Sequence, residues 1–183
     1  MIMISWNTQG AKKPQVVKEV HFLTRTYKAD IIFLLETMAN EKNILKILPQ
    51  MGFDHYDYVL LHNHSRGIIV LRNNGNIHAP ILLKEPRAIH MLVHDPKKGQ
   101  NIIVSGIYAP AQIGDKDQFC EHLTHLNIVF EIPWCLIGDL NELGSPEEKK
   151  WGQLLDRSKF QRLNHFLTEI NVDSIAIKGN IFT

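Results

Sequence analysis

Polar side chains stand at the ends of three apolar runs of the sequence, where strands would deliver them to a sheet edge. Asn7 follows the first run, Glu36 the second, and Asp139 and Asn141 a later one. Residues at such strand tips can converge where loops form a crevice, which is where open sheets bind ligands. Their carboxylate and amide oxygens are the ligands that Mg²⁺ or Mn²⁺ prefers. Because Asp139 and Asn141 are two positions apart, an extended backbone would point both side chains to the same side.

Each of these positions alone also fits a strand that simply ends in polar residues. Glu36 alone could begin a helix, and Asn7 alone could belong to a turn. The prediction of a metal site therefore depends on considering the tips together. His62 and His64 have the spacing of metal ligands on a strand, but without a cysteine or a third partner a zinc site is not expected. His90 fits an ordinary sheet-face or surface position.

The hydrophobic pattern predicts the elements that position these residues. Continuous apolar runs predict buried strands, and apolar residues at helical spacing predict helices. The expected strands cover residues 2–5, 31–35, 67–71, 88–93, 101–108 and 134–137, and a hairpin is expected at residues 174–183. The expected helices cover residues 14–30, 41–48 and 160–170, and a further helix has Phe119, Leu123, Leu126 and Val129 on one face. The central strands follow one another without helices between them, which favours an α+β class with two sheets and helices outside.

Composition places the chain among ordinary globular domains. It has 183 residues, of which 44% are hydrophobic and 21% charged, and this excludes disordered, collagen-like and low-complexity chains. One domain over residues 1–183 is expected, with a core that needs no disulfide or metal staple. The formal net charge of +1 excludes a protein that grips nucleic acid by bulk charge. A phosphate-bearing partner would have to be held by local geometry or by a metal ion.

The two cysteines and the N-terminus carry information about location. Cys120 and Cys135 lie in apolar stretches, so we expect no disulfides and a reducing, intracellular compartment. The opening apolar residues 1–4 are too few for a signal peptide, and no run approaches the length of a membrane span. No signal in the sequence separates the nucleus from the cytoplasm or indicates an oligomeric state.

The motifs at the strand tips, taken in order, resemble the endonuclease/exonuclease/phosphatase superfamily. This superfamily includes deoxyribonuclease I, the apurinic endonucleases and the endonuclease domains of LINE-type retrotransposons, and the last group is the most similar. The motifs are Ser5-Trp6-Asn7-Thr8-Gln9-Gly10, Leu34-Leu35-Glu36-Thr37, Ile107-Tyr108-Ala109-Pro110 and Ile137-Gly138-Asp139-Leu140-Asn141-Glu142. The Gly-Asp-Leu-Asn element is fairly specific, whereas the others would be weak alone.

The resemblance implies a fold, a reaction and roles for these residues. The fold would be a four-layer α/β/β/α sandwich of two mixed sheets, with the site at one edge between the sheets. The reaction would be Mg²⁺-dependent (or Mn²⁺-dependent) hydrolysis of DNA phosphodiester bonds. Glu36 would be the main metal ligand, assisted by Asn7. Tyr108 would contact the scissile phosphate, Asp139 would transfer a proton to or from the attacking water or leaving oxygen, and Asn141 would orient the phosphate or the water.

Two of the departures from the superfamily's pattern bear on activity. Ala111 follows Pro110 where the apurinic branch has Asn, which argues against specificity for abasic sites. The Ser-Asp-His-like element that completes the site in this superfamily is not found. The sequence has one Asp-His pair, Asp54-His55, for which a loop position is expected. We therefore expect a domain truncated at its C-terminus, without the final strands, and impaired or inactive as a nuclease.

Two alternatives stay open from the sequence. The chain could be a non-catalytic remnant or binding module that keeps the fold. It could also be a phosphatase that acts on a phosphorylated small molecule or lipid, since the loops that choose a substrate cannot be interpreted from their sequence.

Overall fold

A computed structural model describes residues 1–11, 14–60, 67–73, 77–95, 98–142, 144 and 157–175. The chain divides into two compact units. The first consists of Met1–Tyr108 and Ile132–Asp139, and the second of Ala109–Glu131 and Leu140–Thr183. The expectation of a single domain over residues 1–183 stays a prediction.

The first unit contains two four-stranded mixed sheets. The first sheet has the order β1-β2-β4-β3 and the second the order β5-β6-β7-β8. Parallel pairs join β1 to β2 and β7 to β8, and all other neighbours are antiparallel. The strands are β1 (Met3–Asn7), β2 (Ile31–Leu35), β3 (His55–Val59), β4 (Ile68–Arg72), β5 (Ile81–Glu85), β6 (Ala88–Asp95), β7 (Gln100–Tyr108) and β8 (Trp134–Asp139). Two mixed sheets with helices confirm the predicted α+β sandwich class.

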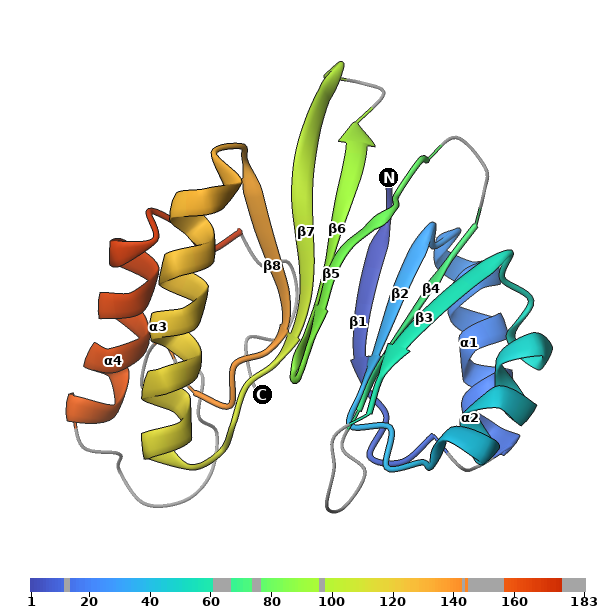
Figure 1. Ribbon diagram of the computed structural model, residues 1–183. Coiled ribbons are helices and arrows are strands. Elements are labelled where there is room, and N and C mark those ends of the chain that lie inside the picture. Colours follow the sequence, from blue (N-terminus) through green and yellow to red (C-terminus); the bar gives the residue numbers. More distant parts are fainter. Residues whose placement is uncertain are drawn as a thin grey trace. The chain divides into compact units, whose positions relative to one another are not determined.

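The first sheet is covered by helices on one face and by the second sheet on the other (Figure 1). The helices are α1 (Pro14–Tyr27), α2 (Glu41–Ile47) and the 3₁₀ helix η1 (Leu48–Met51). Successive side chains of a strand point to opposite faces, so Ile32 and Leu34 of β2 pack in the helix-facing core. Ile31, Phe33 and Leu35 pack in the core between the sheets. All five residues of β2 are buried, as their continuous apolar run predicts.

The two sheets approach closely where Phe33 of β2 lies against Gly106 of β7. A Cβ atom added to Gly106 would stand 2.0 Å from Cδ1 of the Phe33 ring. The ring therefore occupies the space that any other residue at position 106 would need. The wall of the second sheet is flat here because this residue has no side chain.

The second sheet carries a buried chain of hydrogen bonds across β5, β6, β7 and β8. The Trp134 indole N–H donates to the Ser105 hydroxyl at 2.7 Å, and His90 Nδ1 lies 2.7 Å from the same oxygen. His90 Nε2 lies 3.1 Å from a Glu85 carboxylate oxygen. Because the indole can only donate, the consistent arrangement has Ser105 donating to Nδ1 and Nε2–H donating to Glu85. His90 thus has the sheet-face position that the sequence indicates.

The second unit contains α3 (Ile113–Phe130) and α4 (Arg157–Glu169). Lys116, Phe119 and Leu123 are the buried residues of α3. Val129 is 72% exposed, so its assignment to the apolar face was wrong. The reason is rotational: at 100° per residue, position 129 falls outside the stripe that these buried residues define.

Other differences from the sequence-based prediction concern strands. The strands β3 and β5 were not predicted, and His55 begins β3 rather than lying in a loop. The helix expected at residues 41–48 ends at Ile47 and continues as η1. The hairpin expected at 174–183 lies outside the described residues from 176 onward, and residues 174 and 175 are in no strand.

The described helices and cysteines bear on the expected environment. No described helix combines the length and apolar character needed to cross a bilayer. Cys120 and Cys135 are free thiols. Burial is the largest cause that raises the pKa of Cys120 to about 11, and burial also raises the pKa of Cys135. Both thiols are therefore protonated and weakly reactive at neutral pH.

The contact between Phe33 and Gly106 leads to a prediction about stability. Gly106→Ala should lower the free energy of unfolding by about 1–3 kcal/mol, because the new methyl group would force the ring or the strand to move. Gly114→Ala is the matched control, since a Cβ there meets nothing within 4 Å and alanine favours helix. Urea denaturation measures both. Equal midpoints for the two variants would contradict the close approach.

Candidate functional site

Four strands of the first unit, β1, β2, β7 and β8, have their C-terminal ends on the same side of the unit. In the first sheet Asn7 pairs with Leu35, so Glu36 follows directly at the tip of β2. In the second sheet Tyr108 pairs with Asp139 at the tips of β7 and β8. All four strands end at the lower end of the unit in Figure 1. The structure thus brings Asn7, Glu36, Tyr108 and Asp139 to one end of the two sheets.

Asn7 joins the two sheets at this edge. Its side-chain Nδ2 donates to Asp139 Oδ2 at 3.4 Å, and its Oδ1 accepts from the Gln9 backbone N–H at 3.1 Å. An amide held at both ends has its orientation fixed, since a carboxylate accepts only from the NH₂ group. Asn7 therefore orients Asp139. Its Oδ1 is the atom that could bind a cation, through the lone pair that the Gln9 N–H does not use.

Glu36 is held in an unusual backbone conformation. Its φ is +53°, in the left-handed region, and Gln9 and Met38 on the adjoining loops also have positive φ, at +46° and +43°. For residues other than glycine this costs about 1–3 kcal/mol each and persists only where surrounding contacts enforce it. Here the Glu36 carbonyl accepts the Gly10 N–H at 3.0 Å and the Thr8 hydroxyl at 3.4 Å. The loop after β1 thus fixes the residue that carries the candidate metal ligand.

Gly138 brings β8 very close to β7 just before Asp139. Its φ is +149°, and a Cβ there would lie 2.0 Å from the Ile107 carbonyl oxygen. Beside it, the Tyr108 side chain is only 3% exposed and packs in the core between the sheets. The Tyr108 N–H donates to the Arg87 carbonyl at 2.9 Å. The strand tips that carry Tyr108 and Asp139 are therefore rigidly placed by backbone contacts.

Thr37, directly after Glu36, was missed as a feature by the sequence analysis. It is fully buried, and its Oγ1 has no hydrogen-bond partner among the described residues. Its N–H donates to the Gly67 carbonyl at 3.2 Å. An unpaired buried hydroxyl costs stability, and such costs concentrate at functional sites. The signal in the sequence was a small polar residue two positions beyond a fully apolar strand.

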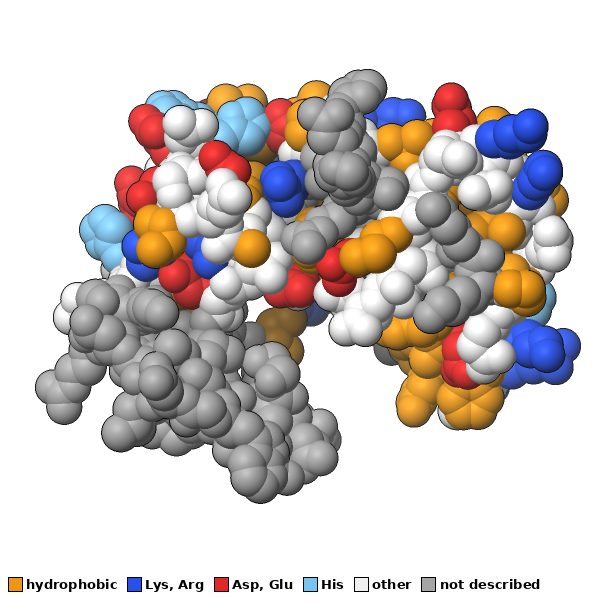
Figure 2. All heavy atoms as spheres, turned by 90° about the horizontal axis from the view of Figure 1, so that it is seen from below, with side chains coloured by type: hydrophobic (Ala, Val, Ile, Leu, Met, Phe, Trp, Pro, Cys, Tyr) orange, Lys and Arg blue, Asp and Glu red, His pale blue; other side chains and the backbone are white. Residues whose placement is uncertain are grey.

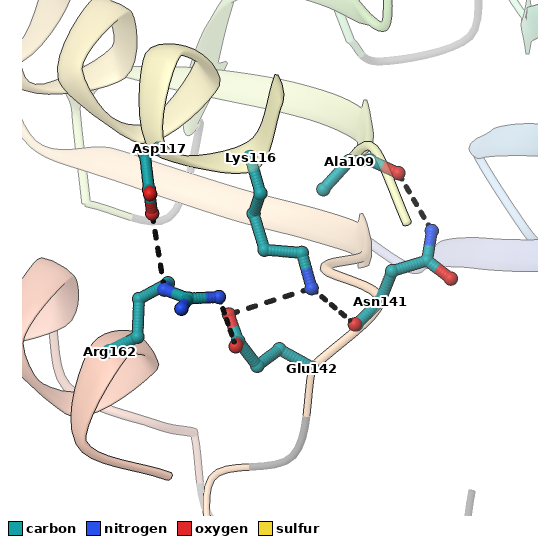
Figure 3. A network of polar contacts seen from close by, with 6 residues as sticks. All are labelled: Ala109, Lys116, Asp117, Asn141, Glu142 and Arg162. Atoms are coloured by element: carbon teal, nitrogen blue, oxygen red, sulfur yellow. Dashed lines mark hydrogen bonds and ion pairs between the residues drawn. The ribbon is translucent and has the colours of Figure 1, made fainter. Parts of the chain in front are cut away.

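Asn141 belongs to the second unit and differs from the expectation. The strand β8 ends at Asp139, and Asn141 has a φ of +50°. The premise that an extended backbone turns both side chains to one side was therefore wrong. The Asn141 Nδ2 donates to the Ala109 carbonyl at 2.7 Å, and its own carbonyl accepts from Lys116 Nζ at 2.6 Å (Figure 3). Its role toward a phosphate or a water stays a prediction.

The donor chemistry of the first unit fits a hard divalent cation. Glu36 and Asp139 supply carboxylates and Asn7 an amide oxygen, the donors that suit Mg²⁺, which keeps several waters of its own. No three of the described His, Cys, Asp and Glu residues form a group that could hold a metal ion. His62 and His64 lie outside the described residues. A site with few protein ligands is still compatible with Mg²⁺, because this ion keeps several of its water ligands when it binds to a protein.

The described Lys and Arg side chains form no single large patch of positive charge on this side. Figure 2 shows the side on which the four strands end, where the described Lys and Arg side chains lie in small separate groups, most of them toward the right of the view. This agrees with the net charge of +1. Affinity for a phosphate would have to come from individual groups at the strand tips.

Known structures identify the fold. The chain is similar to the AP endonuclease LMAP from Leishmania major (15% identity, TM-score 0.70) and to the endonuclease domain of TRAS1, a telomere-specific non-LTR retrotransposon (13%, 0.63). It is also similar to the 3′ phosphatase NExo from Neisseria, whose structure holds a product DNA hairpin (16%, 0.62). These alignments cover 92%, 91% and 91% of this chain but 66%, 69% and 70% of those chains. No protein-family model and no curated protein matches the sequence.

The chain therefore has the fold of the endonuclease/exonuclease/phosphatase proteins. The resemblance to this superfamily, including its LINE-type endonucleases, is confirmed at the level of the fold. The chain spans about two thirds of the length of these structures. The roles of Asn7, Glu36, Tyr108, Asp139 and Asn141 stay predictions.

The strained backbone at Glu36 can be tested by two substitutions at this position. Glu36→Gly and Glu36→Ala both remove the carboxylate, but only alanine keeps a Cβ in the left-handed conformation. The free energy of unfolding of the glycine variant should therefore be about 1 kcal/mol higher than that of the alanine variant. At Leu35, which lies in a regular strand, the order should reverse. Chemical denaturation of the four variants measures this, and the same order at both positions would contradict strain at Glu36.

Proposed function

We propose that this domain is a Mg²⁺-dependent phosphodiester hydrolase of the endonuclease type, acting on DNA. The observation that carries the proposal is the hydrogen bond from Asn7 to Asp139, which ties the polar tips of the two sheets together beside Glu36. Phosphodiester hydrolysis needs a cation at the anionic oxygens, an aligned water and help for the leaving alkoxide. The strand tips offer a group for each requirement.

The role of each residue follows from its chemistry and from the resemblance to the superfamily. Glu36 would hold the metal with help from Asn7, and a bound Mg²⁺ supplies positive charge for the anionic phosphate oxygens. Asp139 accepts a proton from the attacking water or passes one to the leaving oxygen. By the resemblance, Tyr108 would contact the scissile phosphate, and Asn141 would orient the phosphate or the water. The near-neutral charge of the chain makes binding depend on these few groups.

Activity of this chain by itself should be low. The resemblance implies a further Asp-His pair, and the 183 residues contain only Asp54-His55. His55 pairs with Arg72, which pairs with Ile31 at the start of β2. Asp54-His55 therefore lies at the end of the first sheet opposite to Glu36 and cannot serve the strand tips. Lack of one positioned acid–base group costs on the order of 10²–10⁴ in rate.

Binding of Mg²⁺ to the native fold should be visible without catalysis. At a concentration tenfold above its dissociation constant, Mg²⁺ should raise the melting temperature by about 3–6 °C. Glu36→Gln should abolish this shift because it removes the charged ligand. Glu121→Gln, which neutralises an exposed carboxylate of α3, is the control and should keep it. An unchanged shift in Glu36→Gln would refute the assigned metal ligand.

The expected impairment has its own test. Purified chain and the TRAS1 endonuclease domain are compared for Mg²⁺-dependent nicking of supercoiled plasmid DNA. The chain should be at least about 10²-fold slower because its sequence holds no Asp-His pair other than Asp54-His55. Nicking at a comparable rate, lost in Glu36→Gln, would contradict impairment while supporting the proposed reaction. No Mg²⁺ shift and no nicking together would favour the non-catalytic binding module instead.

A further inference from the structure

Lys116 is a buried lysine in the first turn of α3, on the second unit. The residue is 4% exposed. Its ammonium donates to the Asn141 carbonyl at 2.6 Å and lies 3.7 Å from a Glu142 carboxylate oxygen. A buried charge is costly unless it is paired and hydrogen-bonded. The side chain is thus committed to one short segment, residues 141–142 (Figure 3).

Glu142 links this lysine to α4. Its side chain is 9% exposed, and its two carboxylate oxygens face two different cations. One faces Lys116, and the other accepts from Arg162 NH1 at 3.3 Å. Arg162 Nε in turn lies 3.1 Å from Asp117 Oδ1 on α3. Positive and negative groups alternate along this row, so no charge in it is left without an opposite neighbour (Figure 3).

The row ends on a residue whose conformation needs support. Asn141 has a φ of +50°, a strained value for a side chain other than glycine, although asparagine tolerates it better than most residues. Its carbonyl is fixed by Lys116 and its side-chain amide by the Ala109 carbonyl. Both the backbone and the side chain of Asn141 are therefore held. In the sequence Ala109 follows Tyr108, and Asn141 comes two positions after Asp139.

We infer that Lys116, supported by Glu142 and Arg162, is a positioning residue that fixes Asn141. Its consequence for a phosphate rests on the proposed function, whereas the positioning itself does not. A row that served stability alone would gain little from a buried ammonium, because well-packed apolar groups are often as stabilising. The ammonium instead supplies what an apolar group cannot, a donor aimed at the Asn141 carbonyl.

The test reads the side-chain amide of Asn141 by NMR, assigned through its loss in Asn141→Asp. Lys116→Met keeps most of the length of the unbranched side chain but removes the donor. It should speed exchange of the Asn141 amide protons with water by roughly tenfold, the weight of one hydrogen bond. Lys116→Arg, which can again donate to the carbonyl, should restore slow exchange. Lys46→Met, on an exposed lysine of α2, is the matched control and should change nothing.

The outcomes decide the inference in each case. Unchanged Asn141 exchange in folded Lys116→Met overturns it. Failure of Lys116→Arg to restore slow exchange also overturns it, because the loss would then reflect packing rather than donation. If Lys116→Met does not fold, Glu142→Gln takes its place, since it keeps the shape but weakens the anchor of Lys116. Faster exchange in that variant supports the inference, and unchanged exchange overturns it.

The same samples separate this inference from the proposed function. Lys116→Met should keep the Mg²⁺-dependent shift in melting temperature, because Asn7, Glu36 and Asp139 belong to the first unit. A wild-type chain without that shift would refute the metal site, and the NMR result would still decide the role of Lys116.

Discussion

The packing of the two sheets against each other is the constraint on which the candidate site depends. Neither sheet alone brings Asn7 to Asp139, since Asn7 lies on β1 and Asp139 on β8. Their hydrogen bond exists because the apolar faces of the sheets meet in one core, with the Phe33 ring against Gly106. Interiors of this density deform little, so the strand tips inherit the rigidity of the core beneath them. The arrangement of the polar residues at the strand tips therefore depends on the burial of apolar side chains between the two sheets.

The sequence predicted the strands that stand out as apolar runs and the helices that have an apolar face. The strand Ile31–Leu35 is buried on both faces and stands out as an unbroken apolar run, and Pro14 begins α1 as its position suggested. The two missed strands, β3 and β5, are the outermost strands of their sheets. An edge strand is partly solvated, so β3 mixes histidine, aspartate and tyrosine, and β5 exposes two of its three apolar side chains. Their identity as strands comes from pairing with a neighbour, which no local pattern records.

The candidate site likewise has features that the local sequence predicts and features that depend on residues distant in the sequence. Residues at strand tips could be predicted because the end of an apolar run is visible in the sequence. The left-handed backbone at Glu36 and at Asn141 could not, because contacts with residues distant in the sequence hold it. Lys116 was invisible for a related reason. A lysine on a helix is normally solvated, and only the tertiary structure places the segment 141–142 over it.

Gly138 and Asp139 are neighbours in the Gly-Asp-Leu-Asn motif, but the fold requires the first and the proposed chemistry requires the second. Gly138 is required because the Ile107 carbonyl occupies the place of a side chain, and this requirement concerns only how β8 lies along β7. Asp139 makes no such demand on the backbone. A relative of this chain without the proposed activity would still need the glycine to fold, but would be free to lose the aspartate. Among relatives, a glycine at this position would thus indicate an intact architecture, and only the aspartate beside it would indicate the proposed chemistry.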